Sequence, residues 1–388
     1  MKCNGQDAIS GERVVVEWDE GDAAFRYVDS DLAAASGDDA WLAPGFIDLQ
    51  VNGFAGVDFN SPSATHEEIA GAITAIFSTG VTRFFPTVIT GEPQTMLGAL
   101  RNLAAARESL AFGRAMEAFH VEGPHIAPED GPRGAHPKQW VRPPDIDEFQ
   151  RKQEAAEGNI RLVTIAPEWP GTPAFIEQLS RQGVVASIGH TSATPRQIRD
   201  AVSAGARMST HLGNAGANSL PRRDNYLYAQ LAEDRLASSF IVDGHHLSDA
   251  FLKIALRAKG IERSILVTDA APPVMCSPGP YMLGGVEVEL RDDERVTVRG
   301  GERLAGSALR MHRAISNVMR ITDVSLAHAI IMCTSNAARV GRIPGRLRGI
   351  RPGERADLVR FKLEDGRMDV LETYFSGRLV YSSAVSAQ

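Results

Sequence analysis

Short apolar runs alternate with amphipathic stretches through most of the chain. Eight strand-like runs occur, at residues 43–51, 82–89, 117–123, 161–168, 184–190, 206–212, 238–244 and 264–270. Between them apolar residues recur at helical spacing, as in 172–183 and 194–205, and several of these segments open on Ser or Thr and close on Gly. Strands that alternate with helices indicate a parallel α/β fold, and eight such units predict a (β/α)8 TIM-like barrel.

The two chain ends follow a different pattern. Residues 12–30 and 356–383 alternate apolar and polar positions at the period of a β-strand. We therefore expect a small β-sandwich domain built from both ends, residues 1–42 and 345–388, beside a barrel over residues 43–344. 

The loop from Gly123 to Pro144 is long and rich in proline and glycine, and it directly follows the third predicted strand. Loops of this length after a barrel strand are more often functional than idle.

Composition limits the classes of partner. The net charge is −7, with a sequence pI near 5.8, which argues against a nucleic-acid partner. Cys3, Cys276 and Cys333 are far apart and odd in number, so no disulfide framework is expected. The N-terminal residues lack an apolar signal core, and no apolar run is long enough to span a bilayer. We expect a cytoplasmic protein with no membrane partner.

Polar side chains stand at the ends of most predicted strands. In chain order they are Gln50, Asn52, Glu122, His190, His211, Asp243, His246 and Asp269. The carboxyl ends of barrel strands share one face, so these side chains should converge. One carboxylate and two imidazoles, from Glu122, His190 and His211, form a ligand set suited to Zn²⁺ or Fe²⁺ with an open position for water. Asp269 could then serve as the proton shuttle for that water.

Each of these residues also has a purely structural interpretation. A histidine at a strand end is commonly a hydrogen-bonded anchor, and Asp243, followed by Gly244, is interpreted here as a turn residue. The metal hypothesis is favoured because Glu122, His190 and His211 occupy equivalent places in separate βα units, an arrangement that chance rarely produces.

A family resemblance rests on motifs spread from about residue 41 to 360. The segments APGFIDLQVNGFAGVDF, HVEGPHIAPEDGPRGAHP, SIGHTSAT, STHLGNAG, VDGHHL, LVTDAAPP and LAGSAL resemble, in this order, those of N-acetylglucosamine-6-phosphate deacetylases of the amidohydrolase superfamily. The resemblance implies a metal-dependent hydrolase, usually a homodimer, with a barrel and an added β-sandwich. It implies removal of acetate from N-acetylglucosamine 6-phosphate to give glucosamine 6-phosphate.

The same resemblance implies roles for individual residues. Glu122, His190 and His211 match the family's main metal ligands, and Asp269 matches its catalytic acid/base. His136 matches a histidine that contacts substrate and, with the metal, is a candidate partner for the developing oxyanion.

Further matches concern the substrate's sugar and phosphate. His246 corresponds to a second histidine that contacts substrate, and Asn214 with Ala215 falls where backbone and amide groups hold the sugar phosphate. Arg222 falls where an arginine reaches the phosphate, from the neighbouring subunit in dimeric members. Arg223, beside it, is an equally suitable cation by sequence alone.

Two positions depart from the family pattern. Many amidohydrolases have His-x-His after the first strand, where this chain has Gln50-Val51-Asn52, so we expect one divalent metal per chain and at most a weak second site. Gly213 and Gly216 replace larger residues beside the Asn-Ala pair. Alternatives therefore include deacetylation of an N-acetylgalactosamine phosphate or of an unphosphorylated N-acyl compound. An inactive sugar-phosphate-binding protein is a third interpretation.

Overall fold

The computed structural model describes residues 1–20, 23–29, 39–217 and 219–384. Its central element is an eight-stranded sheet in which each strand pairs in parallel with its neighbour. The strands are, in spatial order, β5 (Phe46–Val51), β8 (Val81–Ile89), β9 (Phe119–Glu122), β10 (Ile160–Ile165), β11 (Val185–Ile188), β12 (Met208–Ser209), β13 (Ala237–Phe240) and β14 (Ser264–Leu266). All eight predicted strands, and the TIM-like barrel they imply, are confirmed.

Contacts between the first and last strands close the barrel. Val51 and Ala270 form a parallel bridge, and the Asn52 backbone N–H donates to the Ala270 carbonyl at 2.8 Å. Beneath this bridge the Asp48 carboxylate accepts from the Thr268 hydroxyl at 2.5 Å and from the Thr268 backbone N–H at 3.2 Å. The sheet is thus a closed cylinder.

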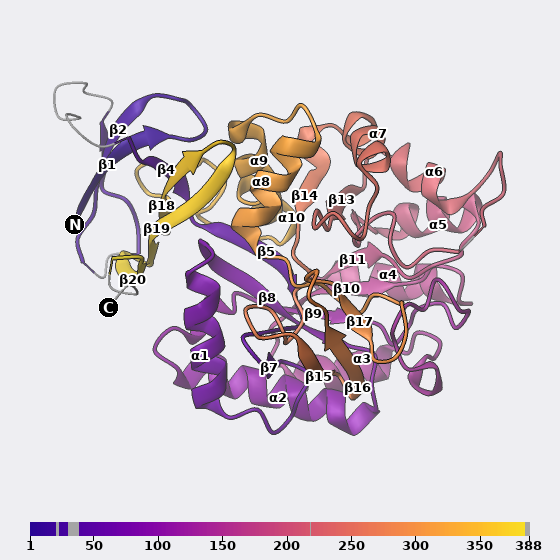
Figure 1. The fold of residues 1–388 in the computed structure, drawn as a ribbon. Helices are drawn as coiled ribbons and strands as arrows, with labels where there is room; N and C mark the ends of the chain where they lie inside the picture. Colours follow the sequence, from indigo (N-terminus) through magenta and orange to yellow (C-terminus); the bar gives the residue numbers. More distant parts are fainter. Residues whose placement is uncertain (21–22, 30–38, 218, 385–388) are drawn as a thin grey trace.

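Helices surround this cylinder (Figure 1). They are α1 (His66–Phe77), α2 (Pro93–Ser109), α3 (Ile146–Ala155), α4 (Thr172–Arg181), α5 (Pro195–Ala204), α6 (Tyr226–Leu231), α7 (Asp249–Lys259), α8 (Met311–Ile321), α9 (Leu326–Met332) and α10 (Ser335–Val340). Thr65 and Thr194 begin α1 and α5 with capping boxes, which satisfy backbone N–H groups that the helix itself leaves unpaired. Every residue of β5 and β8 is buried, as expected of strands covered on both faces.

The chain ends form one seven-stranded sheet, in the order β20-β19-β18-β4-β1-β2-β3. Its strands are β1 (Lys2–Asp7), β2 (Arg13–Glu17), β3 (Tyr27–Asp29), β4 (Trp41–Pro44), β18 (Leu358–Glu364), β19 (Arg367–Phe375) and β20 (Arg378–Ser382). The sheet has an apolar cluster of its own around Trp18, Leu42 and Leu358. It contains strands from both ends of the chain (Figure 1), as the strand-period pattern predicted. The exact domain boundaries stay a prediction.

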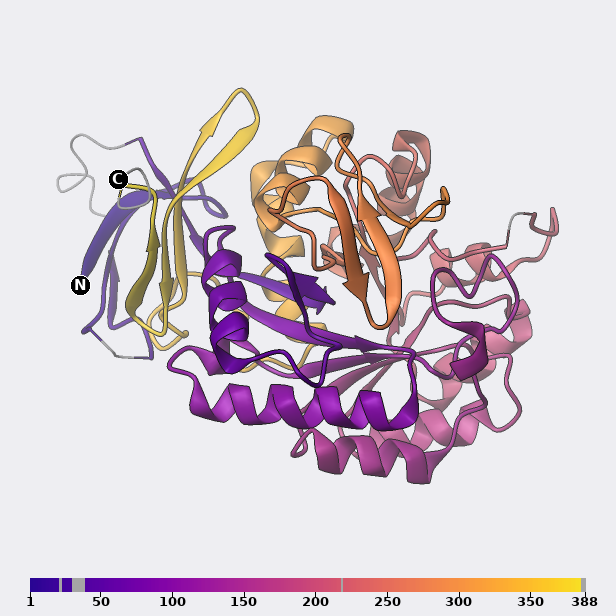
Figure 2. The same cartoon turned by 60° about the horizontal axis from the view of Figure 1, so that its bottom comes forward.

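A small antiparallel sheet interrupts the chain between β14 and α8. It contains β15 (Gly279–Leu283), β16 (Val286–Leu290) and β17 (Val296–Val298), and the sequence pattern did not predict it. A second short hairpin, β6 (Gly53–Phe54) with β7 (Val57–Asp58), follows β5. In Figures 1 and 2 the β15–β17 sheet lies apart from the end sheet, over the barrel.

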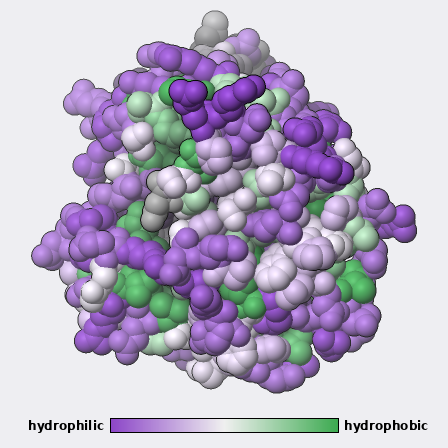
Figure 3. All heavy atoms as spheres, turned by 90° about the vertical axis from the view of Figure 1, so that its right-hand side faces the viewer, coloured by the Kyte–Doolittle hydropathy of each residue, from purple (hydrophilic) through white to green (hydrophobic). Residues whose placement is uncertain are grey.

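Side chains on the molecular surface shown in Figure 3 are mainly hydrophilic, with small separate hydrophobic patches. Over the described residues, no helix has both the length and the apolar character needed to cross a membrane.

A buried charge network joins the end sheet to the barrel. Asp357, fully buried just before β18, accepts from Arg83 Nε on β8 at 2.8 Å and from Arg346 Nη1 at 2.6 Å. Arg83 also pairs with Glu117 at 3.2 Å. Burial alone would raise the pKa of Asp357, but the charges of Arg83 and Arg346 lower it to about 2. The carboxylate of Asp357 thus balances the charges of two buried arginines, Arg83 and Arg346.

Replacing Asp357 by Asn should destabilise the fold, because it leaves the two buried guanidinium groups without their shared carboxylate. We expect the free energy of unfolding at pH 7 to fall by about 3–5 kcal/mol, measured by urea titration. The matched control is Asp369→Asn, in an exposed pair with Arg367 that should change stability by less than about 1 kcal/mol.

The carboxylate of Asp357 also makes the free energy of unfolding depend on pH, in a known direction. Its folded pKa of about 2 lies below the unfolded value of about 3.9, so it stabilises the folded chain above pH 4. About 2 kcal/mol should be lost as the pH falls from 4 to 2, and the Asp357→Asn protein should lack this step. Equal acid sensitivity of the two proteins would contradict the assignment.

Candidate active site

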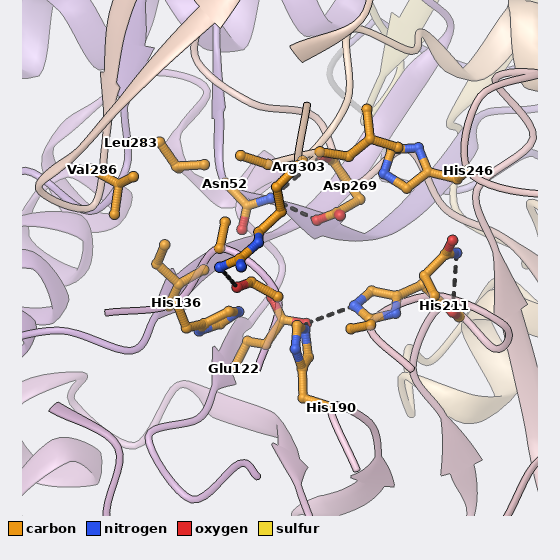
Figure 4. A pocket seen from close by; sticks show the side chains of 18 of the residues that line it. Asn52, Glu122, His136, His190, His211, His246, Asp269, Leu283, Val286 and Arg303 are labelled. Atoms are coloured by element: carbon orange, nitrogen blue, oxygen red, sulfur yellow. Dashed lines mark hydrogen bonds and ion pairs between the residues drawn. The ribbon is translucent and has the colours of Figure 1, made fainter. Parts of the chain in front are cut away.

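A cavity of about 480 Å³ opens at the carboxyl ends of the barrel strands. Its floor carries side chains from the ends of several strands, and Leu283, Val286 and Arg303 from the β15–β17 region line its opposite wall (Figure 4). The predicted site residues that line it are Asn52, Glu122, His136, His190, His211, Asn214, Ala215, His246 and Asp269. Separate βα units have therefore brought these side chains into one place.

One oxygen of Glu122 lies at the centre of the polar cluster. Glu122 Oε1 is 3.0 Å from His211 Nε2 and 3.2 Å from His190 Nε2, and it accepts from Gln50 Nε2 at 3.0 Å. All four side chains are buried. Ligands that share a tetrahedral Zn²⁺ through bonds of about 2.0–2.1 Å lie about 3.3 Å apart. Each of the two histidine nitrogens thus lies at about this separation from Glu122 Oε1.

The hydrogen bonding of His190 fits a metal ligand. Its Nδ1–H donates to the Pro132 carbonyl at 2.9 Å, so a neutral ring would have its lone pair on Nε2, facing Glu122. A histidine that binds a metal commonly donates its other N–H in this way. A lone pair opposed to a carboxylate at 3.2 Å is unfavourable unless a proton or a cation lies between them.

His136 lies at the edge of this cluster. Glu122, His136 and His190 each offer a ligand atom, and these atoms lie within 4.8 Å of one another. The His136 and His190 ring centres are 4.4 Å apart. His136 Nδ1 is 2.8 Å from the Thr90 hydroxyl. By its position, His136 is thus a third imidazole that could bind a metal. The family resemblance instead implied that His136 contacts the substrate.

The Gln50 amide connects Glu122 to the second carboxylate, Asp269, and the Asn52 amide adds a contact to Asp269. Gln50 Nε2 donates to Glu122 Oε1 and also to Asp269 Oδ1, at 3.0 Å in each case, and Asn52 Nδ2 donates to Asp269 Oδ1 at 2.7 Å. The amides therefore present N–H groups to both carboxylates. Their own oxygens, Gln50 Oε1 and Asn52 Oδ1, are buried and have no hydrogen-bond partner among the described residues.

The two carboxyl groups differ in acidity because their partners differ. Burial alone would raise the pKa of Glu122, but the hydrogen bonds and charges of His190 and His211 hold it well below its ordinary value. Asp269 has amide partners instead, and burial together with the nearby charge of Glu122 raises its pKa to about 6. Burial and His190 lower the pKa of His136 to about 3, so this ring is neutral at pH 7.

Several site residues have a left-handed backbone. The φ angles are 50° at His190, 28° at His211, 46° at Ala215 and 52° at Asp269. Such conformations cost a residue other than glycine about 1–3 kcal/mol each and gather at functional sites. At His190, His211 and Asp269 the chain turns just beyond the end of a strand, and all four residues line the cavity.

Residues predicted to contact the substrate lie around the same cavity. His246 Nδ1 is 2.6 Å from Asp243 Oδ2, so Asp243 orients this ring as well as its turn. Asn214 Nδ2 donates to the His211 carbonyl at 3.1 Å. Arg222 and Arg223 are exposed before α6, and neither lines this cavity of its own chain.

Glycine is required at two positions of the loop after His211. Gly213 has φ 100°, and a Cβ there would lie 2.4 Å from Phe251 Cε1. A Cβ on Gly216 would lie 2.6 Å from the Tyr226 hydroxyl, which accepts from the Ala217 backbone N–H at 2.8 Å. Tyr226 and Phe251 thus fill the space that larger loop residues would need.

The sequence did not predict two kinds of residue at this site: one that contacts a predicted site residue, and those that line the opposite wall of the cavity. Thr90, which contacts His136, directly follows β8 and belongs to no motif. Leu283, Val286 and Arg303 belong to the unpredicted insertion, and nothing in their sequence indicates that they face a cavity made mainly by other segments.

Comparison with known proteins agrees with this architecture. The model of the amidohydrolase family matches residues 41–380. The chain is 32% identical over 353 residues to N-acetylglucosamine-6-phosphate deacetylase of Bacillus subtilis, covering 90% of this chain and 87% of the relative. It is 31% identical over 338 residues to N-acetylgalactosamine-6-phosphate deacetylase of Escherichia coli O157:H7, covering 87% of each.

A solved structure gives the same result in three dimensions. N-acetyl-D-glucosamine-6-phosphate deacetylase of Mycobacterium smegmatis, in complex with N-acetyl-D-glucosamine-6-phosphate, superposes with a TM-score of 0.89 at 29% identity. The match covers 98% of this chain and 99% of that one. The chain belongs to the amidohydrolase family, within its N-acetylglucosamine-6-phosphate deacetylase group.

Proposed function

We propose that the protein hydrolyses the acetamide of N-acetylglucosamine 6-phosphate, giving glucosamine 6-phosphate and acetate. The observation that carries the proposal is the position of Asp269: a carboxyl group with a pKa of about 6 lines the same cavity as the Glu122–His190–His211 cluster and is linked to it by Gln50. The family and the names of its relatives supply the reaction class. The homodimer and the cytoplasmic location stay predictions.

In this proposal Glu122, His190 and His211 hold one divalent cation, Zn²⁺ or Fe²⁺. Bound there, the cation supplies a Lewis acid that lowers the pKa of water and polarises an amide carbonyl. Gln50 and Asn52 direct N–H groups toward the carboxylates, so they favour a single metal. His211 is preferred to His136 as the third ligand because its Nε2 is 3.0 Å from Glu122 Oε1 and because the family resemblance gives the ligand role to His211.

Asp269 moves the proton. Gln50 and Asn52 both occupy Oδ1, and among the described residues Oδ2 has no hydrogen-bond partner. Oδ2 therefore takes a proton from the attacking water and returns it to the sugar nitrogen as the C–N bond breaks. A pKa of about 6 suits both steps, because the group is ionised at neutral pH yet readily protonated.

His136 and His246 bind the substrate around this centre. The contact of His136 Nδ1 with the Thr90 hydroxyl orients this ring, which is neutral at pH 7 because its pKa is about 3. In this proposal the Nε2–H of His136 donates to the carbonyl oxygen. Asp243 Oδ2 accepts from His246 Nδ1–H at 2.6 Å, which fixes the orientation of that ring. Asn214 and Ala215 supply amide and backbone groups to the sugar phosphate.

A second candidate substrate is N-acetylgalactosamine 6-phosphate. The Escherichia coli relative carries that name, and Gly213 and Gly216 alter the loop that shapes the sugar pocket. The two sugars differ only in the orientation of one hydroxyl, which the reacting groups do not contact in this mechanism. Loop shape alone would therefore decide between them.

A steady-state assay of acetate release tests the function. We expect turnover of N-acetylglucosamine 6-phosphate, with kcat/KM at least about 100-fold above that of unphosphorylated N-acetylglucosamine, because the phosphate adds charge-assisted contacts. A higher kcat/KM for N-acetylgalactosamine 6-phosphate would reverse the choice of sugar. Absence of acetate from all three would contradict the proposal and favour a binding protein.

Metal content tests the ligand set. Purified protein should carry about one Zn²⁺ or Fe²⁺ per chain, and His211→Ala should remove most of it because one imidazole is lost. Inductively coupled plasma mass spectrometry measures this directly. His136→Ala and the exposed control His328→Ala should retain the metal. Two tightly held metals per chain, or equal loss in His136→Ala, would show that the assignment is wrong.

Asp269→Asn tests the proton shuttle. The amide keeps the size of the carboxyl group but cannot take a proton, so kcat should fall by at least ~100-fold while metal content stays unchanged. Asp249→Asn, an exposed position at the start of α7, is the matched control. Near-normal turnover in metal-loaded Asp269→Asn would assign the proton transfer to another group.

A further inference from the structure

We infer that Arg303 is the residue with which this chain itself binds the anionic group of its substrate. The inference rests on the proposed function, since it assigns a specificity-determining role within the same cavity. No family match pointed to Arg303 in the sequence, and it stands in the segment that returns from the unpredicted β15–β17 sheet.

Backbone contacts fix this residue at the cavity wall. The Val298 N–H donates to the Arg303 carbonyl at 2.8 Å, and Leu304 forms an antiparallel bridge with Thr297. The Arg303 side chain then reaches the opposite wall, where Nη1 donates to the Gly134 carbonyl at 3.1 Å. Figure 4 shows the guanidinium group directed toward the His136 side of the cavity.

Gly134 places that contact next to the reacting centre. A Cβ built on Gly134 would lie 3.1 Å from His190 Cε1 and 3.7 Å from Ala215 Cβ. The Arg303 guanidinium therefore lies near both the proposed metal cluster and the loop that is predicted to hold the sugar phosphate. A substrate with its amide at the cluster and its anionic group at this wall would span the cavity.

Arg303 is the one arginine or lysine among the described residues that line the cavity. The nearest acidic side chains of the rim are already engaged: Glu302 pairs with Arg291 at 2.9 Å, and Asp130 pairs with Arg133. In the described part of the chain Arg303 has no ion pair, and its hydrogen bond is to a neutral carbonyl. Most of its five N–H groups remain available, in the planar fork that suits phosphate oxygens.

Net charge explains why such a cation is needed. Four carboxyl groups line the cavity, from Glu122, Asp130, Asp269 and Glu302, so the charge of a phosphate that enters it must be compensated. Arg303 is exposed, as Arg222 and Arg223 are, but only Arg303 of these three lines the cavity of its own chain. Arg303 is therefore the available permanent charge within one chain, whatever a partner subunit adds.

A competing interpretation is that Arg303 has a structural role that does not depend on its charge. Its hydrogen bond joins the inserted sheet to the Gly123–Pro144 loop, and loss of that bond would disturb every substrate alike. Arg303→Gln separates the two ideas, because glutamine keeps an N–H donor for the Gly134 carbonyl but removes the charge. Arg303→Lys keeps the charge but loses the fork.

The experiment compares N-acetylglucosamine with and without its 6-phosphate in the metal-loaded enzyme. Arg303→Gln should lower kcat/KM for the phosphorylated sugar by about 10- to 100-fold, mainly through KM, and change the unphosphorylated sugar less than about 2-fold. Arg303→Lys should recover part of the loss. Arg299→Gln, an exposed pair with Glu287 on the same insertion, should behave as wild type.

A binding measurement keeps the inference independent of turnover. The Kd of glucosamine 6-phosphate, measured by calorimetry, should rise by the same factor in Arg303→Gln. An unchanged Kd, equal losses on both sugars, or a loss confined to Arg222→Gln would each overturn the role of Arg303. If wild type released no acetate but Arg303→Gln still weakened glucosamine 6-phosphate binding, the deacetylase proposal alone would fail.

Discussion

The hydrogen bonds between Asp48 and Thr268 join the first barrel strand to the last, and the active-site arrangement depends on that closure. Asp48 is buried, and burial raises its pKa to about 7 even though Thr268 donates to it. The same carboxylate accepts from the Gln50 backbone N–H at 3.2 Å. Closure thus brings Gln50 and Asn52, at the end of β5, against Asp269, just beyond β14. Without closure of the barrel, these residues, more than 200 positions apart in the sequence, would not be in contact.

The contact of Gln50 and Asn52 with Asp269 also helps to give the two carboxyl groups of the cavity different acidities. Glu122 is surrounded by imidazoles, which stabilise its charge, whereas Asp269 meets amides and the repulsion of Glu122. A group whose charge is stabilised makes a ligand, and a group whose charge is partly opposed makes an acid or base near neutral pH. Gln50 donates to both, so it holds them at a fixed separation while leaving their acidities different.

Reaction and recognition come from different parts of the architecture. The polar cluster stands on barrel strands whose buried residues hold it rigidly, while the facing wall comes from the β15–β17 insertion and the Gly123–Pro144 loop. A change of substrate can therefore arise in the insertion or in the glycine loop without altering the cluster. Gly213 illustrates this, because its neighbour Phe251 belongs to α7 and not to the reacting centre.

The order of strands and helices was predictable from local pattern, since period and capping depend on neighbouring residues. All eight barrel strands and the paired chain ends were found in this way, and the convergence of Glu122, His190, His211 and Asp269 followed from barrel geometry. The inserted sheet was missed because the strand–helix alternation predicts no element between β14 and α8. Arg303 was missed with it.

The sequence by itself determined which segments become strands and which polar residues end them, because each depends on interactions close along the chain. Only the tertiary structure decided that Gln50 bridges Glu122 and Asp269, that Asp269 is the weaker acid, and that Arg303 faces the cluster. These properties arise from burial and from contacts between distant segments, and no local pattern encodes the distance between two side chains that meet only when the barrel closes.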